Sequence, residues 1–128
     1  MNLLYRTDFI EINHDPATNI LTCRWFGVQQ TEKIMEAGMV ILTHVKAKRI
    51  SRVLNDNREV RGSWLTAADW AAEDWFPQMR TAGLQHFAWI LPRNVFAELS
   101  AKVAMRHSNV VRTFKSYEEA YEWLSAQQ

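Results

Sequence analysis

Residues 87–91 of this chain read Phe-Ala-Trp-Ile-Leu, and this apolar run constrains the fold more than any other feature. A strand that is apolar at every position is typical of a sheet covered on both faces, because an exposed face would require polar residues in alternation. Helical periodicity occurs before the run, at 31–48, and after it, at 94–103. Strands that alternate with helices need crossover connections, so the strands in this part of the chain are predicted to run parallel.

The amino-terminal region is predicted to form an antiparallel hairpin. Residues 3–12 mix aromatic and β-branched residues with polar ones, residues 15–19 contain turn formers, and residues 20–26 alternate between apolar and polar. Two shorter strands are expected at 52–56 and 110–114. Together with the apolar run, these segments predict a mixed sheet of five strands.

Four helices are expected between and after these strands. Thr31 is predicted to cap the first helix and Thr66 the second, while residues 92–94 open the third. The last begins with a capping box, in which the Ser116 hydroxyl and the Glu119 carboxylate each bind a free backbone N–H group. The element order is then β-β-α-β-α-β-α-β-α, an α/β fold with about four helices in a single domain over residues 1–128.

Apolar periodicity also predicts which side chains face the core. In the third helix the inward residues are expected to be Phe96, Leu99 and Val103, whereas Val40 of the first helix is expected to be exposed and could contribute to a homodimer contact. The predicted core includes Trp25, Ile34, Ile41, Val53, Leu54, Ala88, Ile90, Phe114 and Leu124.

Several segments together resemble the SpoIIAA-like family of bacterial STAS proteins. They are Asp56 at the end of the third strand, the stretch from Trp75-Phe76-Pro77 to Gly83, and residues 114–124, which read Phe-Lys-Ser-Tyr-Glu-Glu-Ala-Tyr-Glu-Trp-Leu. The resemblance covers nearly the whole chain and implies the STAS fold, which is also likened to a truncated lipid-binding SEC14 domain. It implies no catalytic residues.

The chain departs from this family at the start of the second helix. Anti-sigma-factor antagonists of this fold carry an Asp-Ser-(Ser/Gly)-Gly-Leu signature with a phosphorylated Ser, whereas residues 61–69 here read Arg-Gly-Ser-Trp-Leu-Thr-Ala-Ala-Asp. Thr66 is the hydroxyl residue at the expected start of the helix, and it lacks the flanking Asp or Gly. We interpret Thr66 as a helix cap, with phosphorylation as the alternative, so a sigma-factor phosphoswitch is not expected.

Composition and spacing argue against several kinds of chemistry. Cys23 is the single cysteine, so no disulfide framework or CxxC zinc site can form, and a reducing, cytoplasmic compartment is expected. The four histidines lack metal-ligand spacing, and no glycine-rich phosphate loop or G-x-S-x-G motif occurs. We therefore expect no enzyme, metal or cofactor. A net charge of +1 and the lack of a long apolar run predict neither nucleic-acid binding nor a transmembrane segment.

Two side chains call for an explanation. Asp74 is expected to project inward between Trp70 and Trp75, where a buried carboxylate needs a partner. A structural ion pair is the favoured interpretation, with a ligand-binding or acid/base role as the alternative. Trp64 lies in a polar, glycine-containing loop and is interpreted as a lid over the core or as an anchor for a ligand or partner. The candidate partners of Asp74 are Arg58, Arg61 and Arg80.

Polar residues that follow the central strands predict a binding rim. Ligands of open α/β sheets meet the carboxyl ends of the parallel strands, where helix N-termini offer free amides. We expect a non-catalytic interaction or regulatory module with an unknown protein partner, and the alternative is a SEC14-like carrier of a small apolar or anionic ligand. The module is preferred because a well-packed domain of this length has little internal volume. The predicted rim consists of Asp56, Asn57, Arg58, Trp64, Thr66, Arg93 and Asn94.

Overall fold

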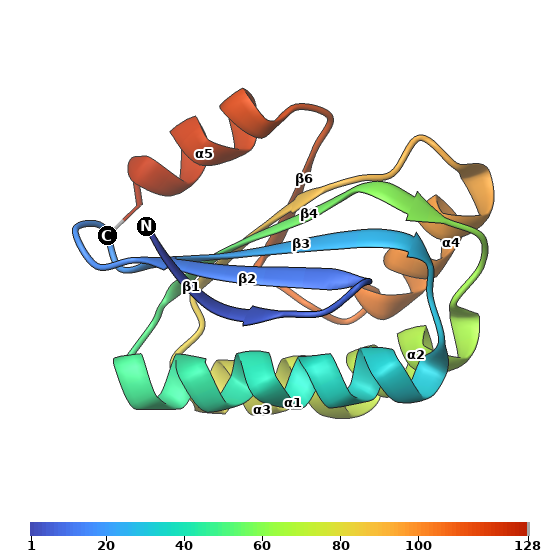
Figure 1. Ribbon diagram of the computed structural model, residues 1–128, viewed down its shortest axis with the longest axis horizontal. Helices are drawn as coiled ribbons and strands as arrows, with labels where there is room; N and C mark the ends of the chain where they lie inside the picture. Colours follow the sequence, from blue (N-terminus) through green and yellow to red (C-terminus); the bar gives the residue numbers. More distant parts are fainter. Residues whose placement is uncertain (128) are drawn as a thin grey trace.

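A six-stranded mixed sheet organises the computed structural model, which describes residues 1–127 (Figure 1). The strands lie in the sheet in the order in which they occur in the sequence. The first three pair antiparallel, and the third to sixth pair parallel. Parallel pairing of the last three strands confirms the crossover argument. The strands are β1 (Asn2–Arg6), β2 (Ile10–Asp15), β3 (Ile20–Val28), β4 (Arg52–Arg61), β5 (His86–Ile90) and β6 (Val111–Phe114).

Helices cover both faces of this sheet. Figure 1 shows α5 over one face and α1 with α3 along the other. α4 lies at the right-hand end of the sheet, towards which the arrow of β4 points. Because α2, η1 and α3 follow one another without a break, the described residues contain four helical segments, as expected. No described helix combines the length and apolar character needed to cross a membrane. The helices are α1 (Thr31–Lys48), α2 (Leu65–Trp70), the π-helix η1 (Ala71–Trp75), α3 (Phe76–Thr81), α4 (Val95–Ala104) and α5 (Tyr117–Ser125).

The prediction of five strands is wrong, because residues 3–12 form two strands and not one. A tight turn separates β1 from β2: the Thr7 backbone N–H donates to the Ile10 carbonyl oxygen over 2.9 Å. The Thr7 hydroxyl accepts from the backbone N–H groups of Phe9 and Ile10, each over 3.2 Å. A Thr side chain that binds the backbone two and three residues later favours a turn over a continuous strand.

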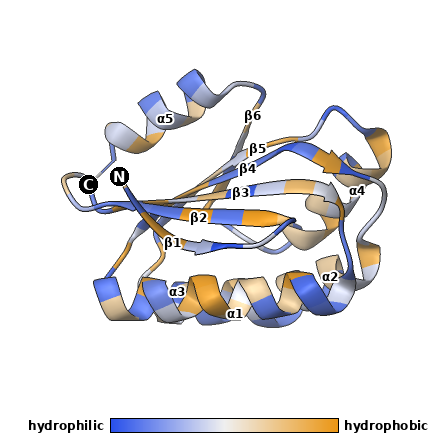
Figure 2. Cartoon of the chain, in the orientation of Figure 1, coloured by the Kyte–Doolittle hydropathy of each residue, from blue (hydrophilic) through white to orange (hydrophobic). Residues whose placement is uncertain are grey.

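The hydrophobic core has two parts, one on each face of the sheet. The larger lies between the sheet and α1, α2, η1, α3 and α4, and the smaller lies under α5. Figure 2 shows apolar residues in the middle of α1, with mostly hydrophilic residues towards its two ends. Eight of the nine predicted core residues are buried, and Phe114 is half-buried against the α5 cluster. Cys23 is also buried in β3, as expected, and burial raises the pKa of its thiol above the ordinary value.

Two of the three predicted helix caps are wrong. Thr31 lies inside α1, which Gln30 precedes, and Thr66 lies inside α2, which Trp64 precedes. Neither Gln30 nor Trp64 makes a side-chain capping bond. The start of α2 is held by tertiary contact instead, because the Trp64 backbone N–H donates to Ser100 Oγ of α4 over 2.8 Å. The cap at Ser116 is confirmed, because its hydroxyl accepts from the Glu119 backbone N–H, but within the described residues the Glu119 carboxylate makes no return bond. α4 opens at the predicted place, and the Asn94 side chain accepts from backbone N–H groups of its first turn.

The predicted inward face of α4 is also wrong. The helix buries its small residues, Ala97, Ser100, Ala101 and Ala104, and α2 packs against it. Small side chains allow two helices to approach closely, which outweighs the apolar periodicity of the larger residues. Phe96 and Leu99 are consequently exposed, and Val103 is half-buried. In α1, Val40 is half-buried against the core and not exposed as expected.

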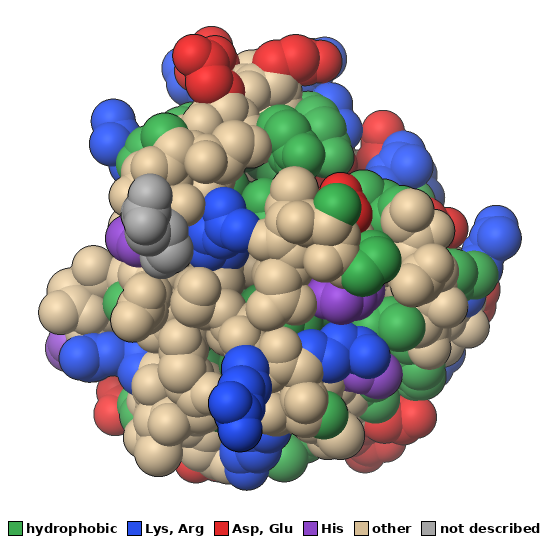
Figure 3. All heavy atoms as spheres, turned by 90° about the vertical axis from the view of Figure 1, so that its left-hand side faces the viewer, with side chains coloured by type: hydrophobic (Ala, Val, Ile, Leu, Met, Phe, Trp, Pro, Cys, Tyr) green, Lys and Arg blue, Asp and Glu red, His purple; other side chains and the backbone are tan. Residues whose placement is uncertain are grey.

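Charged side chains are dispersed over the end of the molecule that lies on the left of Figure 1. Figure 3 shows Lys and Arg there in several separate places, among acidic, apolar and His side chains. A nucleic-acid surface would gather its Lys and Arg into one stripe or patch. Among the described residues visible in this view, Lys and Arg do not form a single stripe.

Candidate functional site

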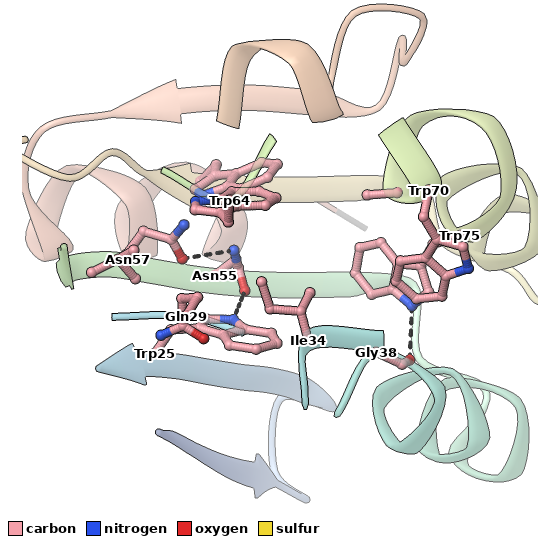
Figure 4. A pocket seen from close by; sticks show the side chains of 12 residues that line it. Trp25, Gln29, Ile34, Gly38, Asn55, Asn57, Trp64, Trp70 and Trp75 are labelled. Carbon is pink, nitrogen blue, oxygen red and sulfur yellow. Dashed lines mark hydrogen bonds between the residues drawn. The ribbon is translucent and has the colours of Figure 1, made fainter. Parts of the chain in front are cut away.

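A small cavity lies between the sheet and the helices α1, α2 and η1, and tryptophan dominates its wall (Figure 4). The cavity has a volume of about 40 Å3 and is partly open to solvent. Five of the six tryptophans line it. The lining residues are Trp25, Gln29, Ile34, Gly38, Asn55, Asn57, Val60, Trp64, Trp70, Ala71, Trp75 and Trp89.

Three neighbouring strands supply the floor of the cavity. Trp25 of β3 and Asn55 of β4 are paired through a hydrogen bond, in which the indole Nε1 donates to Asn55 Oδ1 over 2.8 Å. Asn55 Nδ2 donates to Asn57 Oδ1 over 3.2 Å. Side chains two residues apart on a strand lie on the same face, so both asparagines face the cavity. Trp89 reaches the same face from β5.

A π-helix places two further tryptophans against α1. Trp70 and Trp75 are five residues apart, and a hydrogen bond from i to i+5 brings such residues to the same side of the helix. Their ring centroids lie 6.4 Å apart. Trp75 Nε1 donates to the Gly38 carbonyl oxygen over 2.7 Å, and a Cβ at Gly38 would lie 2.7 Å from Trp70 Cη2. Glycine is therefore needed at position 38 for this close approach.

The same π-helix explains why the prediction for Asp74 is wrong. The extra residue in the turn rotates Asp74 out to solvent, where it accepts a hydrogen bond from Gln78 Nε2 over 3.1 Å. The buried carboxylate that does need a partner is Asp56. Its Oδ1 accepts from Arg58 Nε over 3.0 Å and its Oδ2 from Arg58 Nη2 over 2.8 Å. This bond with Asp56 raises the pKa of the Arg58 guanidinium above its ordinary value.

Three buried polar atoms of the cavity wall have no hydrogen-bond partner among the residues that the structure describes. They are the indole Nε1 donors of Trp64 and Trp89 and the amide oxygen Oε1 of Gln29. The Trp64 and Trp89 rings are stacked, with centroids 6.1 Å apart and planes 24° apart. Gln29 is anchored through its other amide atom, since Nε2 donates to the Phe26 carbonyl oxygen over 2.8 Å. Buried polar atoms nearly always have a partner, so the wall presents three unsatisfied hydrogen-bonding groups.

The structure does not bring the seven predicted rim residues together. Asn57 and Trp64 line the cavity, but Asp56 and Arg58 lie on the opposite face, where the Arg58 guanidinium carbon is 5.8 Å from the centre of the Tyr117 ring. Thr66 and Arg93 are exposed at the surface, and Asn94 caps α4.

The length of β4 explains this division of the rim. β4 does not end at Asp56 but continues to Arg61, because β3 pairs with it through Val28. Residues 56–58 therefore lie inside a strand, where successive side chains point to opposite faces.

The sequence placed Trp25 in the predicted core and Trp89 in a strand covered on both faces, and it did not point to Gln29. The signal that could have found the cavity is the number of tryptophans, six in 128 residues. A buried indole N–H usually finds a hydrogen-bond partner, so many tryptophans in a short chain indicate a place to look for unpaired donors.

Comparison with known proteins supports the fold of the chain and identifies neither an activity nor a partner. No family model matches the chain, and no curated protein matches it. Among solved structures, the chain is similar to an uncharacterized protein of the DUF3478 family with a SpoIIAA-like fold from Shewanella loihica PV-4. The two share 17% sequence identity with a TM-score of 0.58, over 94% of this chain and 98% of that one. The chain therefore has a SpoIIAA-like α/β fold, as the resemblance implied.

Proposed function

We propose that this chain is a non-catalytic interaction or regulatory module that binds a protein partner through one face of α4. The observation that carries the proposal is a group of large apolar side chains left in solvent: Val95 is 69% exposed, Phe96 67% and Leu99 50%. Residues three and four apart share one face of a helix, so Leu99 lies beside both of the others. Exposed apolar patches on soluble domains mark interaction sites.

A fourth apolar residue extends this surface onto α2. Leu65 is 46% exposed and directly follows Trp64, whose backbone N–H is bound to Ser100 of α4. The two helices pack against each other, so the start of α2 lies against α4. We call these four residues, Leu65, Val95, Phe96 and Leu99, the α4 face.

Charge near the α4 face indicates the chemistry of the partner. Arg93 is exposed just before α4 and forms no ion pair within residues 1–127, whereas Lys102 is paired with Glu98 over 3.4 Å. A partner segment with apolar side chains on one side and a carboxylate next to Arg93 would complement both features. The partner we propose is therefore an amphipathic, acidic segment of another protein. With a single cysteine and this role, the cytoplasm is the compartment we propose.

The cavity bears on the alternative of a SEC14-like carrier. Pockets that enclose drug-sized ligands or lipid tails have volumes of roughly 300–1,000 Å3. The cavity of about 40 Å3 would have to expand severalfold to enclose a lipid tail. The observed packing thus favours the interaction module over a lipid carrier.

Site-specific cross-linking tests this proposal directly. A photoreactive phenylalanine analogue replaces Phe96 in cells of the source organism, and a second variant carries the analogue at Met39, an exposed apolar residue of α1. We expect one protein with an acidic, amphipathic segment to be cross-linked at position 96 and not at position 39. Cross-links to lipid only, to a second copy of this chain, or equally from both positions would contradict the proposal.

A further inference from the structure

We infer that the tryptophan-lined cavity binds a small uncharged amide group, held by the indole N–H groups of Trp64 and Trp89 and by the amide oxygen of Gln29. This inference does not rest on the α4 face. The cavity lies on the inner side of α2, whereas the α4 face points to solvent. Either proposal can fail without the other.

The unpaired atoms of the wall define which hydrogen bonds the ligand must make. Trp64, Trp89 and Gln29 are only 8%, 3% and 9% exposed, so bulk water does not solvate their side chains freely. The two indoles can only donate, and the unpaired atom of Gln29 can only accept. A ligand that fits must therefore carry both a hydrogen-bond acceptor and a donor. A carboxamide has both on one planar group.

Two other indole N–H groups of the cavity wall already have hydrogen-bond partners within the chain. Trp25 is bound to Asn55, and Trp75 is bound to Gly38. These side chains already have partners within the chain, so their indole N–H groups are not free for a ligand. Among the fully buried polar atoms of the wall, the unpaired ones within the described residues belong to the stacked Trp64 and Trp89 and to Gln29, and these atoms are the recognition elements.

The absence of charged side chains from the cavity wall favours an uncharged ligand. None of the twelve lining residues is ionisable. Burying an ion without a partner of opposite charge is costly, which disfavours both carboxylates and ammonium groups. Aromatic rings can attract a cation, but the unpaired indole N–H groups direct partial positive charge at the ligand and there is no acidic residue to balance it. An amide avoids both costs.

The volume of the cavity limits how much of a ligand can enter it. One water needs about 10–15 Å3 of such space, so about 40 Å3 holds a group of a few non-hydrogen atoms. Acetamide has that size. Because the cavity is partly open to solvent, a larger molecule could place its amide inside and leave the rest outside.

Indole N–H resonances provide a direct readout in the intact protein. The six tryptophans give six signals in a nitrogen-edited NMR spectrum, which are assigned by single Trp→Phe variants. Acetamide is titrated, with acetate as the charged isostere and tetramethylammonium as the cation. We expect acetamide to shift the Trp64 and Trp89 signals saturably in the millimolar range. The Trp123 signal should not move, because Trp123 lies outside the cavity beside Phe114.

Variants separate a bound amide from trapped water. Trp64→Phe keeps an aromatic ring and removes the donor, and should weaken acetamide binding about tenfold. Gln29→Leu removes the acceptor without touching the tryptophans and should have a similar effect, so the test does not depend on one variant folding. Trp123→Phe should leave the affinity unchanged. Three results would overturn the inference: no saturable shift with acetamide, equal shifts with acetate or tetramethylammonium, or unchanged affinity in both cavity variants. The first would leave water as the occupant.

Discussion

Asp56 is a buried carboxylate that Arg58 neutralises from two residues away on the same strand. Both side chains lie on the α5 side of the sheet, where Arg58 is also close to the Tyr117 ring. The Asp56 oxygens accept from the guanidinium and from the Arg58 backbone N–H over 3.1 Å. These hydrogen bonds satisfy the buried carboxylate, and the contact of Arg58 with Tyr117 links the pair to α5.

The matched substitutions Arg58→Ala and Arg93→Ala test this pair. We expect Arg58→Ala to lower the free energy of unfolding by about 1–3 kcal/mol, because it leaves Asp56 with only the backbone N–H. Arg93 is exposed, so Arg93→Ala should change the free energy of unfolding by less than about 0.5 kcal/mol. Chemical denaturation measures both. Equal effects of the two changes would show that the Asp56 pair is dispensable.

The starts of α4 and α2 are stabilised in different ways. Asn94 Oδ1 accepts from the backbone N–H groups of Phe96 and Ala97 over 2.9 and 3.2 Å, which stabilises the start of α4. Thr66 makes no such bond at the start of α2. Helix starts can therefore be stabilised by a local cap, as in α4, or by contact with a neighbouring helix, as in α2.

The pair Asn94→Ala and Thr66→Ala separates these two modes. Loss of the Asn94 cap should lower the free energy of unfolding by about 1 kcal/mol, whereas Thr66→Ala should cost less than about 0.5 kcal/mol. Thermal unfolding followed by circular dichroism is sufficient for the comparison. A larger loss for Thr66→Ala would restore the interpretation of Thr66 as a cap.

The sequence predicted elements where local patterns determine them and failed where tertiary packing does. The apolar β5, the cap at Ser116 and the parallel order of β4, β5 and β6 follow from local residue types and the crossover rule. The orientation of α4 depends on close helix packing, and the outward rotation of Asp74 depends on a π-helix. Apolar periodicity along the chain reveals neither feature.

At the scale of the whole molecule, the fold separates two surfaces with different chemistry. The cavity gathers side chains from β3, β4, β5, α1, α2 and η1, so its position follows only from the complete topology. That is why the sequence predicted Trp64 and Asn57 as site residues but grouped them with Asp56 and Arg58 on the other face. The α4 face, by contrast, is exposed because α4 uses its alanines for packing.

The affinity of the cross-linked partner for matched variants tests the central claim, that the α4 face is the docking surface. Calorimetry compares the wild-type chain with Phe96→Ser and with Met39→Ser, both of which remove an exposed apolar side chain. An aromatic side chain at the centre of an interface contributes about 2 kcal/mol or more, so Phe96→Ser should weaken binding at least about thirtyfold. Met39→Ser should leave the affinity unchanged. Equal affinity of Phe96→Ser and the wild-type chain would contradict the account.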